Sequence, residues 1–179
     1  MNLIEKTLGK EYKYKGRIIN LRVDDIELPD KQKATREVIE HNGGVSVVAV
    51  TENNEILLVK QYRYPYSEVI TEIPAGKLNK GEDLLECAKR ELAEETGATA
   101  KEWEFLGEVY PTPAYCEEIL YIYMAQDLSF GEQNLDEDEF LEVMRLPISE
   151  AKRKALSGEF KDAKTIVGIL RACDRLNQF

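Results

Sequence analysis

The sequence has few of the residues that build disulfide frameworks, zinc sites or membrane spans. It contains three cysteines and one histidine among 179 residues, and an odd number of widely spaced cysteines is typical of reduced thiols. No apolar run approaches the ~18 residues of a membrane span, and the N-terminus alternates charged and apolar side chains, unlike a secretory signal. These absences predict a cytoplasmic protein that does not bind membranes.

The sequence also lacks an excess of basic residues. It has 34 acidic residues against 24 lysines and arginines, a formal charge of −10, and no basic cluster. We therefore expect no nucleic-acid partner. An acidic protein can still bind an anionic small molecule when divalent cations bridge its carboxylates to phosphate. The composition thus favours a metal-dependent site for a phosphorylated small molecule.

The length predicts one domain with an appendage. Residues 11–40 read as alternating strands separated by turn signals at Lys15-Gly16 and at residues 28–31. This pattern predicts a β-rich N-terminal subdomain over residues 1–41 and a main domain over residues 42–179.

The main domain mixes strand and helix patterns. The apolar runs 45–50 and 56–59 flank a turn signal and predict a β-hairpin. A strand at residues 69–73 is followed by Pro74-Ala75-Gly76, which reads as a turn. Further predicted elements are helices at 83–96, 149–156 and 164–176, strands at 103–110, 119–125 and 140–144, and an acidic loop at 131–139.

Carboxylates cluster on one side of the predicted helix 83–96. At about 100° per residue, the apolar residues form a core stripe, and Glu91, Glu94 and Glu95 lie beside it. Acids in the last turns of a helix are disfavoured by its dipole, and Glu91 and Glu95 repel each other. A hard divalent cation, Mg²⁺ or Mn²⁺, would offset these costs, because oxygen ligands suit such ions. The alternative is that these are solvated glutamates on an ordinary helix.

The same helix lies in a longer motif. Residues 76–82 read GKLNKGE, and residues 90–98 read RELAEETGA. This resembles the Nudix box at every position except the last, where Ala98 is smaller than usual. The resemblance implies an α/β fold, an α/β/α sandwich around a mixed sheet, and hydrolysis of a nucleoside diphosphate linked to another group. It also implies Mg²⁺ bound by the three glutamates, with Arg90 orienting them; a surface i,i+4 pair between Arg90 and Glu94 is the alternative.

Residues outside the box resemble the ADP-ribose pyrophosphatase branch of the family. The segments VKQYR at 59–63 and EIPAG at 72–76 resemble the strand and turn ahead of its box. The resemblance implies that Arg63 contacts the substrate diphosphate, that Glu72 helps at the metal site, and that the Ala75 carbonyl is a metal ligand.

Two segments after the box carry the same resemblance. Pro113 marks the branch and is implied to contact substrate, although Thr112 and Ala114 stand where the branch has serine and glycine. These departures leave the sugar open. In the branch an acidic loop closes over substrate and supplies the catalytic base, which implies Glu139, with Glu137 close enough to compete.

The N-terminal section resembles the swapped subdomain of the branch and implies a homodimer. The resemblance suggests that Arg36, Glu37 and His41 line the nucleoside end of the site, although a core or turn histidine is an equal reading of His41. The expected reaction converts ADP-ribose to AMP and ribose 5-phosphate. The alternatives are a GDP-sugar hydrolase, a non-hydrolysing nucleotide sensor, and an interaction module built on the same fold.

Overall fold

The computed structural model describes residues 2–137 and 139–177. The chain forms two compact units. Unit 1 consists of Met1–Gly43 and Tyr110–Ile119, and unit 2 consists of Gly44–Val109 and Leu120–Phe179. Unit 1 is therefore assembled from two segments that are distant in the sequence.

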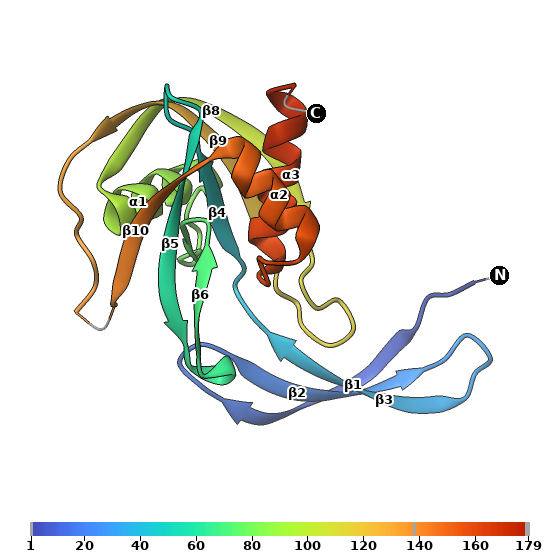
Figure 1. Ribbon diagram of the computed structural model, residues 1–179. Helices are drawn as coiled ribbons and strands as arrows, with labels where there is room; N and C mark the ends of the chain where they lie inside the picture. Colours follow the sequence, from blue (N-terminus) through green and yellow to red (C-terminus); the bar gives the residue numbers. More distant parts are fainter. Residues whose placement is uncertain (1, 138, 178–179) are drawn as a thin grey trace. The chain divides into compact units, whose positions relative to one another are not determined.

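Unit 1 contains a three-stranded antiparallel sheet in the order β1 (Lys6–Lys15), β2 (Asn20–Glu27) and β3 (Lys33–Glu40) (Figure 1). The segment Tyr110–Ile119 joins it at β3, where Ile39 N donates to Tyr115 O at 2.7 Å and Glu117 N donates to Ile39 O at 2.9 Å. The predicted N-terminal strands are thus present, and the later segment is tied to them through the backbone.

The described residues of unit 2 form two sheets and three α-helices, which are labelled in Figure 1. The mixed sheet runs in the order β7 (Ala75–Lys77), β4 (Gly44–Ala49), β9 (Leu120–Phe130) and β8 (Ala98–Val109), with β4 and β9 parallel. The second sheet, which is antiparallel, runs β10 (Leu141–Pro147), β5 (Glu55–Arg63) and β6 (Glu68–Glu72). A 3₁₀ turn, η1 (Tyr64–Tyr66), joins β5 and β6, and the helices are α1 (Leu84–Thr96), α2 (Ile148–Ser157) and α3 (Ala163–Arg175).

Strand β4 divides the core of unit 2 into two apolar clusters. Side chains alternate along a strand, so Val45 and Val47 pack in the cluster that includes Leu92 of α1. Val48 packs instead in the cluster that includes Ile169 of α3. The predicted α/β/α sandwich around a mixed sheet is confirmed. Among the described helices, none is long and apolar enough to cross a membrane.

Two local predictions are wrong. The runs at 45–50 and 56–59 do not form a paired hairpin: β4 and β5 belong to different sheets and meet only at a bridge between Val50 and Ile56. Apart from Ser46, both runs are apolar, and such runs carry no alternation that would specify which neighbour they pair with. Ala75–Lys77, expected as a turn, is strand β7 and pairs with β4; proline is tolerated immediately before it because the ladder begins there.

Candidate functional site

Helix α1 carries the predicted carboxylates and has well-defined ends. At its start the Asp83 carboxylate accepts hydrogen bonds from Leu85 N at 2.9 Å and Glu86 N at 3.1 Å. It ends at Gly97, which has a left-handed φ of 68° and donates to Ala93 O. These caps fix the register of the helix, and the register decides which glutamates face the sheet.

Glu95 is the most deeply buried of these glutamates. The residue is 4% exposed, and its Oε2 accepts a hydrogen bond from Ala75 N at 3.0 Å. Burial, together with the charges of Glu91 and Glu139, raises the pKa of Glu95 to about 8 despite that hydrogen bond. A buried carboxylate whose pKa is raised in this way is stabilised in its charged form by a bound cation.

The backbone polar groups of Ala75 lie on the side of β7 where its N–H binds Glu95. It lies opposite Ser46 in the β4–β7 ladder, and the adjacent Val47 N donates to Pro74 O at 2.8 Å. In an antiparallel ladder successive residues direct their N–H and C=O groups alternately toward and away from the partner strand. Since the Ala75 N–H points to Glu95, the Ala75 carbonyl also points away from β4.

Glu91 lies directly over Gly76. A Cβ atom built on Gly76 would be 1.8 Å from Glu91 Cδ, so no larger residue fits while this carboxylate keeps its position. Burial raises the pKa of Glu91, and the charges of Glu94 and Glu139 add to the shift. The glycine at the start of the motif therefore makes room for the carboxylate from α1.

Arg90 binds three carboxylates and is more than a surface i,i+4 partner of Glu94. Its Nε and Nη2 donate to the two oxygens of Glu82 at 2.9 and 3.1 Å. Its Nη1 donates to Glu91 Oε1 at 2.7 Å and to Glu94 Oε2 at 2.9 Å. Hydrogen bonds from Arg90 lower the pKa of Glu82 to about 2. The sequence analysis gave Glu82 no role, although its fixed position in the motif was a signal.

Arg63 and Glu72 form a second charged group. Arg63 Nε and Nη2 donate to the two oxygens of Glu72 at 2.6 and 2.7 Å, and Glu72 is 2% exposed. Lys164, buried in the first turn of α3, also pairs with Glu72. The Arg63 charge lowers the pKa of Glu95. Sequence reasoning missed Lys164; the available signal was a lysine in a first helical turn, where the dipole disfavours cations.

The acidic loop 131–139 follows β9 in the sequence, and its first half contacts the C-terminal end of α1. Asn134 N donates to Glu94 O at 3.0 Å, and Gln133 Nε2 donates to Glu95 O at 2.5 Å. Farther along, Glu139 is half-buried and Glu137 is exposed. The negative charge of Glu139 contributes to the raised pKa of both Glu91 and Glu95. The loop therefore brings Glu139 within electrostatic range of the buried carboxylates.

The donor set suits a hard divalent cation. Among the described side chains, no three of His, Cys, Asp and Glu converge on a ready-formed metal site; Glu91 and Glu94 accept from Arg90, and Glu95 accepts from Ala75. The donors are nevertheless all oxygens, two of the carboxylates are largely buried, and burial raises their pKa values. These properties fit Mg²⁺ or Mn²⁺ better than a metal that prefers nitrogen or sulfur ligands.

Family comparisons agree with this geometry. The family model described as the NUDIX domain matches residues 40–166, and a model of the nucleoside diphosphate sugar hydrolase N-terminal domain matches residues 5–39. The chain belongs to the Nudix family.

Relatives of this Nudix protein match it over most of its length. An ADP-ribose pyrophosphatase from Bacillus subtilis (strain 168) is 45% identical over 170 residues, covering 94% of this chain and 92% of the relative. A methanol dehydrogenase activator from Bacillus methanolicus is 42% identical and covers 92% and 90%. A crystal structure of an ADP compounds hydrolase has a TM-score of 0.87, 23% identity, and coverage of 99% and 97%. That structure supports the fold alone.

The other residues predicted to contact substrate lie in unit 1 of the Nudix protein; they are Arg36, Glu37, His41 and Pro113. Arg36 and Glu37 are consecutive on β3 and so face opposite sides of the sheet. Arg36 donates to both oxygens of Glu5, from Nε at 3.0 Å. His41 Nδ1 accepts from Gly43 N at 3.1 Å, and Pro113 is exposed in the segment Tyr110–Ile119.

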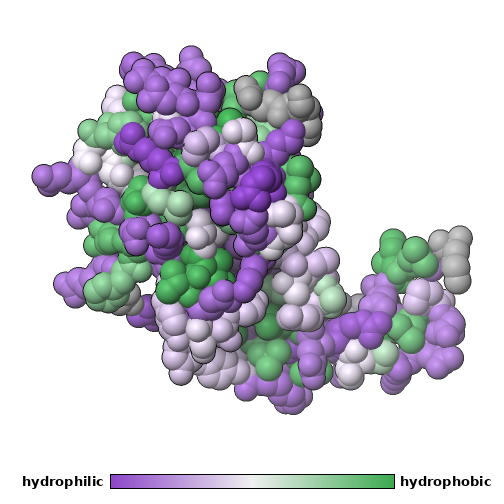
Figure 2. Space-filling view, viewed as in Figure 1, coloured by the Kyte–Doolittle hydropathy of each residue, from purple (hydrophilic) through white to green (hydrophobic). Residues whose placement is uncertain are grey.

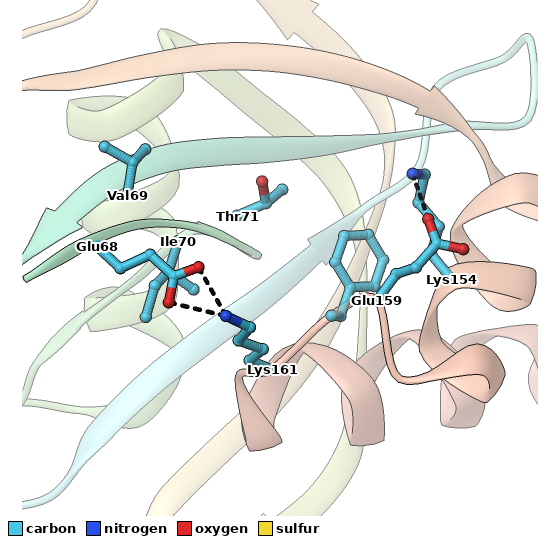
Figure 3. A pocket seen from close by; sticks show the side chains of 8 residues that line it. Glu68, Val69, Ile70, Thr71, Lys154, Glu159 and Lys161 are labelled. Atoms are coloured by element: carbon cyan, nitrogen blue, oxygen red, sulfur yellow. Dashed lines mark hydrogen bonds and ion pairs between the residues drawn. The ribbon is translucent and has the colours of Figure 1, made fainter. Parts of the chain in front are cut away.

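A hollow elsewhere in unit 2 contains none of the predicted site residues. It has a volume of about 320 Å³ and lies between β6 and the end of α2 (Figure 3). Its charged side chains are paired with one another: Lys161 with Glu68, and Lys154 with Glu159. The carboxylates of α1 therefore remain the candidate site of the Nudix fold.

Proposed function

We propose that this protein hydrolyses the diphosphate bond of ADP-ribose, releasing AMP and ribose 5-phosphate. The observation that carries the proposal is the juxtaposition of buried Glu95, Glu91 over Gly76, and the outward-facing backbone of Ala75. The name of the Bacillus subtilis relative supports ADP-ribose as the substrate.

In this proposal Glu91, Glu94, Glu95 and the Ala75 carbonyl hold Mg²⁺, with Mn²⁺ as the alternative ion. When bound, such ions neutralise charge on the diphosphate and lower the pKa of a coordinated water. Arg90 orients Glu91 and Glu94 through its two hydrogen bonds from Nη1. Both oxygens of Glu72 are occupied by Arg63, so Glu72 acts at the edge of the metal site by holding Arg63 in place.

Glu139 is proposed to accept the proton of the attacking water. Its support is that Glu139 is half-buried and lies within electrostatic range of Glu91 and Glu95. Arg63 is proposed to stabilise charge on the diphosphate, and its side chain, which is 40% exposed, is accessible to substrate. The alternative base is Glu137.

Product analysis tests the proposal. Purified protein is incubated with Mg²⁺ and either ADP-ribose, GDP-mannose or NADH, with Glu95→Gln as the control. AMP and ribose 5-phosphate should appear fastest from ADP-ribose and be absent in the control. Faster turnover of GDP-mannose would instead support the GDP-sugar alternative, and no turnover of any substrate would support a sensor.

We also propose that the protein is a homodimer in which unit 1 contacts a second copy. Strand β1 is an edge strand of ten residues, and Leu8, Tyr12 and Tyr14 on it are 47%, 44% and 59% exposed. Figure 2 shows hydrophobic residues among hydrophilic ones at the N-terminal end of unit 1. Long exposed edge strands are usually covered. Sedimentation analysis should give twice the 20.5 kDa mass of the chain; a monomeric mass at micromolar concentration would reject the dimer.

A further inference from the structure

Unit 1 contains a buried arginine surrounded by carboxylates. Arg22 lies in the middle of β2 and is 6% exposed. Its Nε donates to Asp24 Oδ1 at 3.0 Å, its Nη2 donates to Glu117 Oε1 at 2.7 Å, and its Nη1 pairs with Glu40. Each guanidinium nitrogen therefore donates to a different carboxylate.

One of these contacts joins segments that are distant in the sequence. Asp24 and Glu40 belong to the same sheet as Arg22, whereas Glu117 lies 95 residues farther along, in Tyr110–Ile119. Hydrogen bonds between Ile39 and the backbone of Tyr115 and Glu117 hold the same segment. The Arg22–Glu117 pair is thus a charged side-chain link that accompanies a short backbone pairing.

The linked segment forms a compact turn. Cys116 N donates to Thr112 O at 3.0 Å, and Pro113 lies exposed within this turn. Its backbone partner Ile39 is a residue of β3 that lies between Glu37 and His41 in the sequence. Fixing Glu117 therefore also fixes the position of the Pro113 turn relative to the end of β3.

The two ends of the link differ in their contribution to stability. Arg22 is buried, so its removal would leave Asp24 buried and unpaired. The Glu117 side chain is 48% exposed, and partly exposed ion pairs contribute little to global stability. A change at Glu117 can therefore release the segment without unfolding unit 1.

We propose that Arg22 is a positioning residue that, through Glu117, fixes Tyr110–Ile119 against β3, so that the two form one substrate-binding surface. This inference rests on the proposed function, and on the expectation from the family resemblance that Glu37, His41 and Pro113 line the substrate site. It predicts that weakening the link changes substrate affinity and leaves the chemical step unchanged, since the carboxylates of α1 belong to unit 2.

The test compares Glu117→Gln with Glu27→Gln, a matched change at another ion-paired acid of unit 1. With ADP-ribose and Mg²⁺, Glu117→Gln should raise KM about tenfold, as expected for loss of a charge-assisted hydrogen bond. Its kcat and midpoint of thermal unfolding should stay at the wild-type values. Glu27→Gln should change none of these quantities.

A second comparison tests the route through Arg22. Arg22→Lys keeps the charge but cannot donate from three nitrogens in fixed directions. If the two residues act through one link, the KM of Arg22→Lys/Glu117→Gln should be close to that of the more impaired single variant. If the increases in KM caused by the two single changes multiply in the double variant, the inference is overturned.

Calorimetric binding of ADP-ribose without divalent metal separates this inference from the proposed function. If wild type binds but does not hydrolyse ADP-ribose, the proposed function fails, and a tenfold higher Kd for Glu117→Gln still supports the positioning role. If wild type hydrolyses ADP-ribose and Glu117→Gln leaves both KM and Kd unchanged, the proposed function stands and the positioning role is rejected. Absence of both binding and hydrolysis rejects both.

Discussion

Two arginines in this protein, Arg22 in unit 1 and Arg90 in unit 2, each bind three carboxylates, but they differ in burial and in what surrounds them. The side chains of Arg22 and Asp24 are both only 7% exposed. Arg90 is 31% exposed and binds Glu82, Glu91 and Glu94 at a helix surface. The first arginine is thus buried in unit 1, whereas the second is partly exposed.

The comparison shows two ways in which a buried carboxylate can be stabilised: by a charged side chain of the protein or by a bound metal ion. Asp24 is buried and has Arg22 as its cation. Glu95 is as deeply buried as Asp24, but its hydrogen bond comes from the neutral backbone of Ala75. A carboxylate in that position is costly when charged, and a bound divalent ion offsets the cost. We therefore expect the loss of the buried Arg22 charge to affect folding, and changes around Glu95 to affect activity.

Glu95→Gln should give the largest effect. We expect kcat/KM for ADP-ribose to fall on the order of a thousandfold, because a ligand to the catalytic ions loses its charge. Thermal unfolding without divalent metal should not shift to a lower temperature, since the amide can still accept from Ala75 and carries no buried charge. Glu86→Gln, at an exposed acid on the same helix, should retain wild-type activity. Similar activity in the two variants would remove Glu95 from the proposed metal site.

Replacing each arginine by methionine tests the comparison directly. Arg22→Met should lower the free energy of unfolding by about 3 kcal/mol, because it leaves Asp24 as a buried unpaired charge. Arg90→Met should lower it by only about 1 kcal/mol, because the pairs it breaks are partly exposed. Urea unfolding at pH 7 measures both. Equal losses of stability would mean that burial does not distinguish the two clusters.

The sequence was sufficient to predict the parts of the structure that have strong local signals. The predicted helix 83–96 agrees with α1 to within one residue, because Asp83 and Gly97 are standard capping residues at its two ends. Spacing alone placed Glu91, Glu94 and Glu95 together on one side of this helix. Strand pairing was predicted less well, because the apolar residues of β4 and β5 suit any buried neighbour, and the two strands joined different sheets.

Contacts between distant segments could not be predicted from local patterns. Nothing around Arg22 in the sequence identifies Glu117 as its partner, and Lys164 resembles an ordinary helical lysine until α3 packs against Glu72. The close approach of Glu91 to Gly76 also depends on how α1 lies on β7. These charged contacts arise from tertiary packing, which amino-acid spacing does not encode.

Glu82→Gln should give the smallest effect, one that depends on pH. Hydrogen bonds from Arg90, and a further one from Asn79 N, lower the pKa of Glu82 from 4.5 to about 2, so its charge stabilises the folded state fully above pH 4.5. This stabilisation is lost as the pH falls from 4.5 toward 2. The difference in unfolding free energy between wild type and Glu82→Gln should therefore be constant near pH 7 and shrink to less than roughly half by pH 3. In an Arg90→Met background the difference should be reduced, because only the hydrogen bond from Asn79 N remains. A difference that grows on acidification would show that Glu82 stabilises the fold through contacts other than its pair with Arg90.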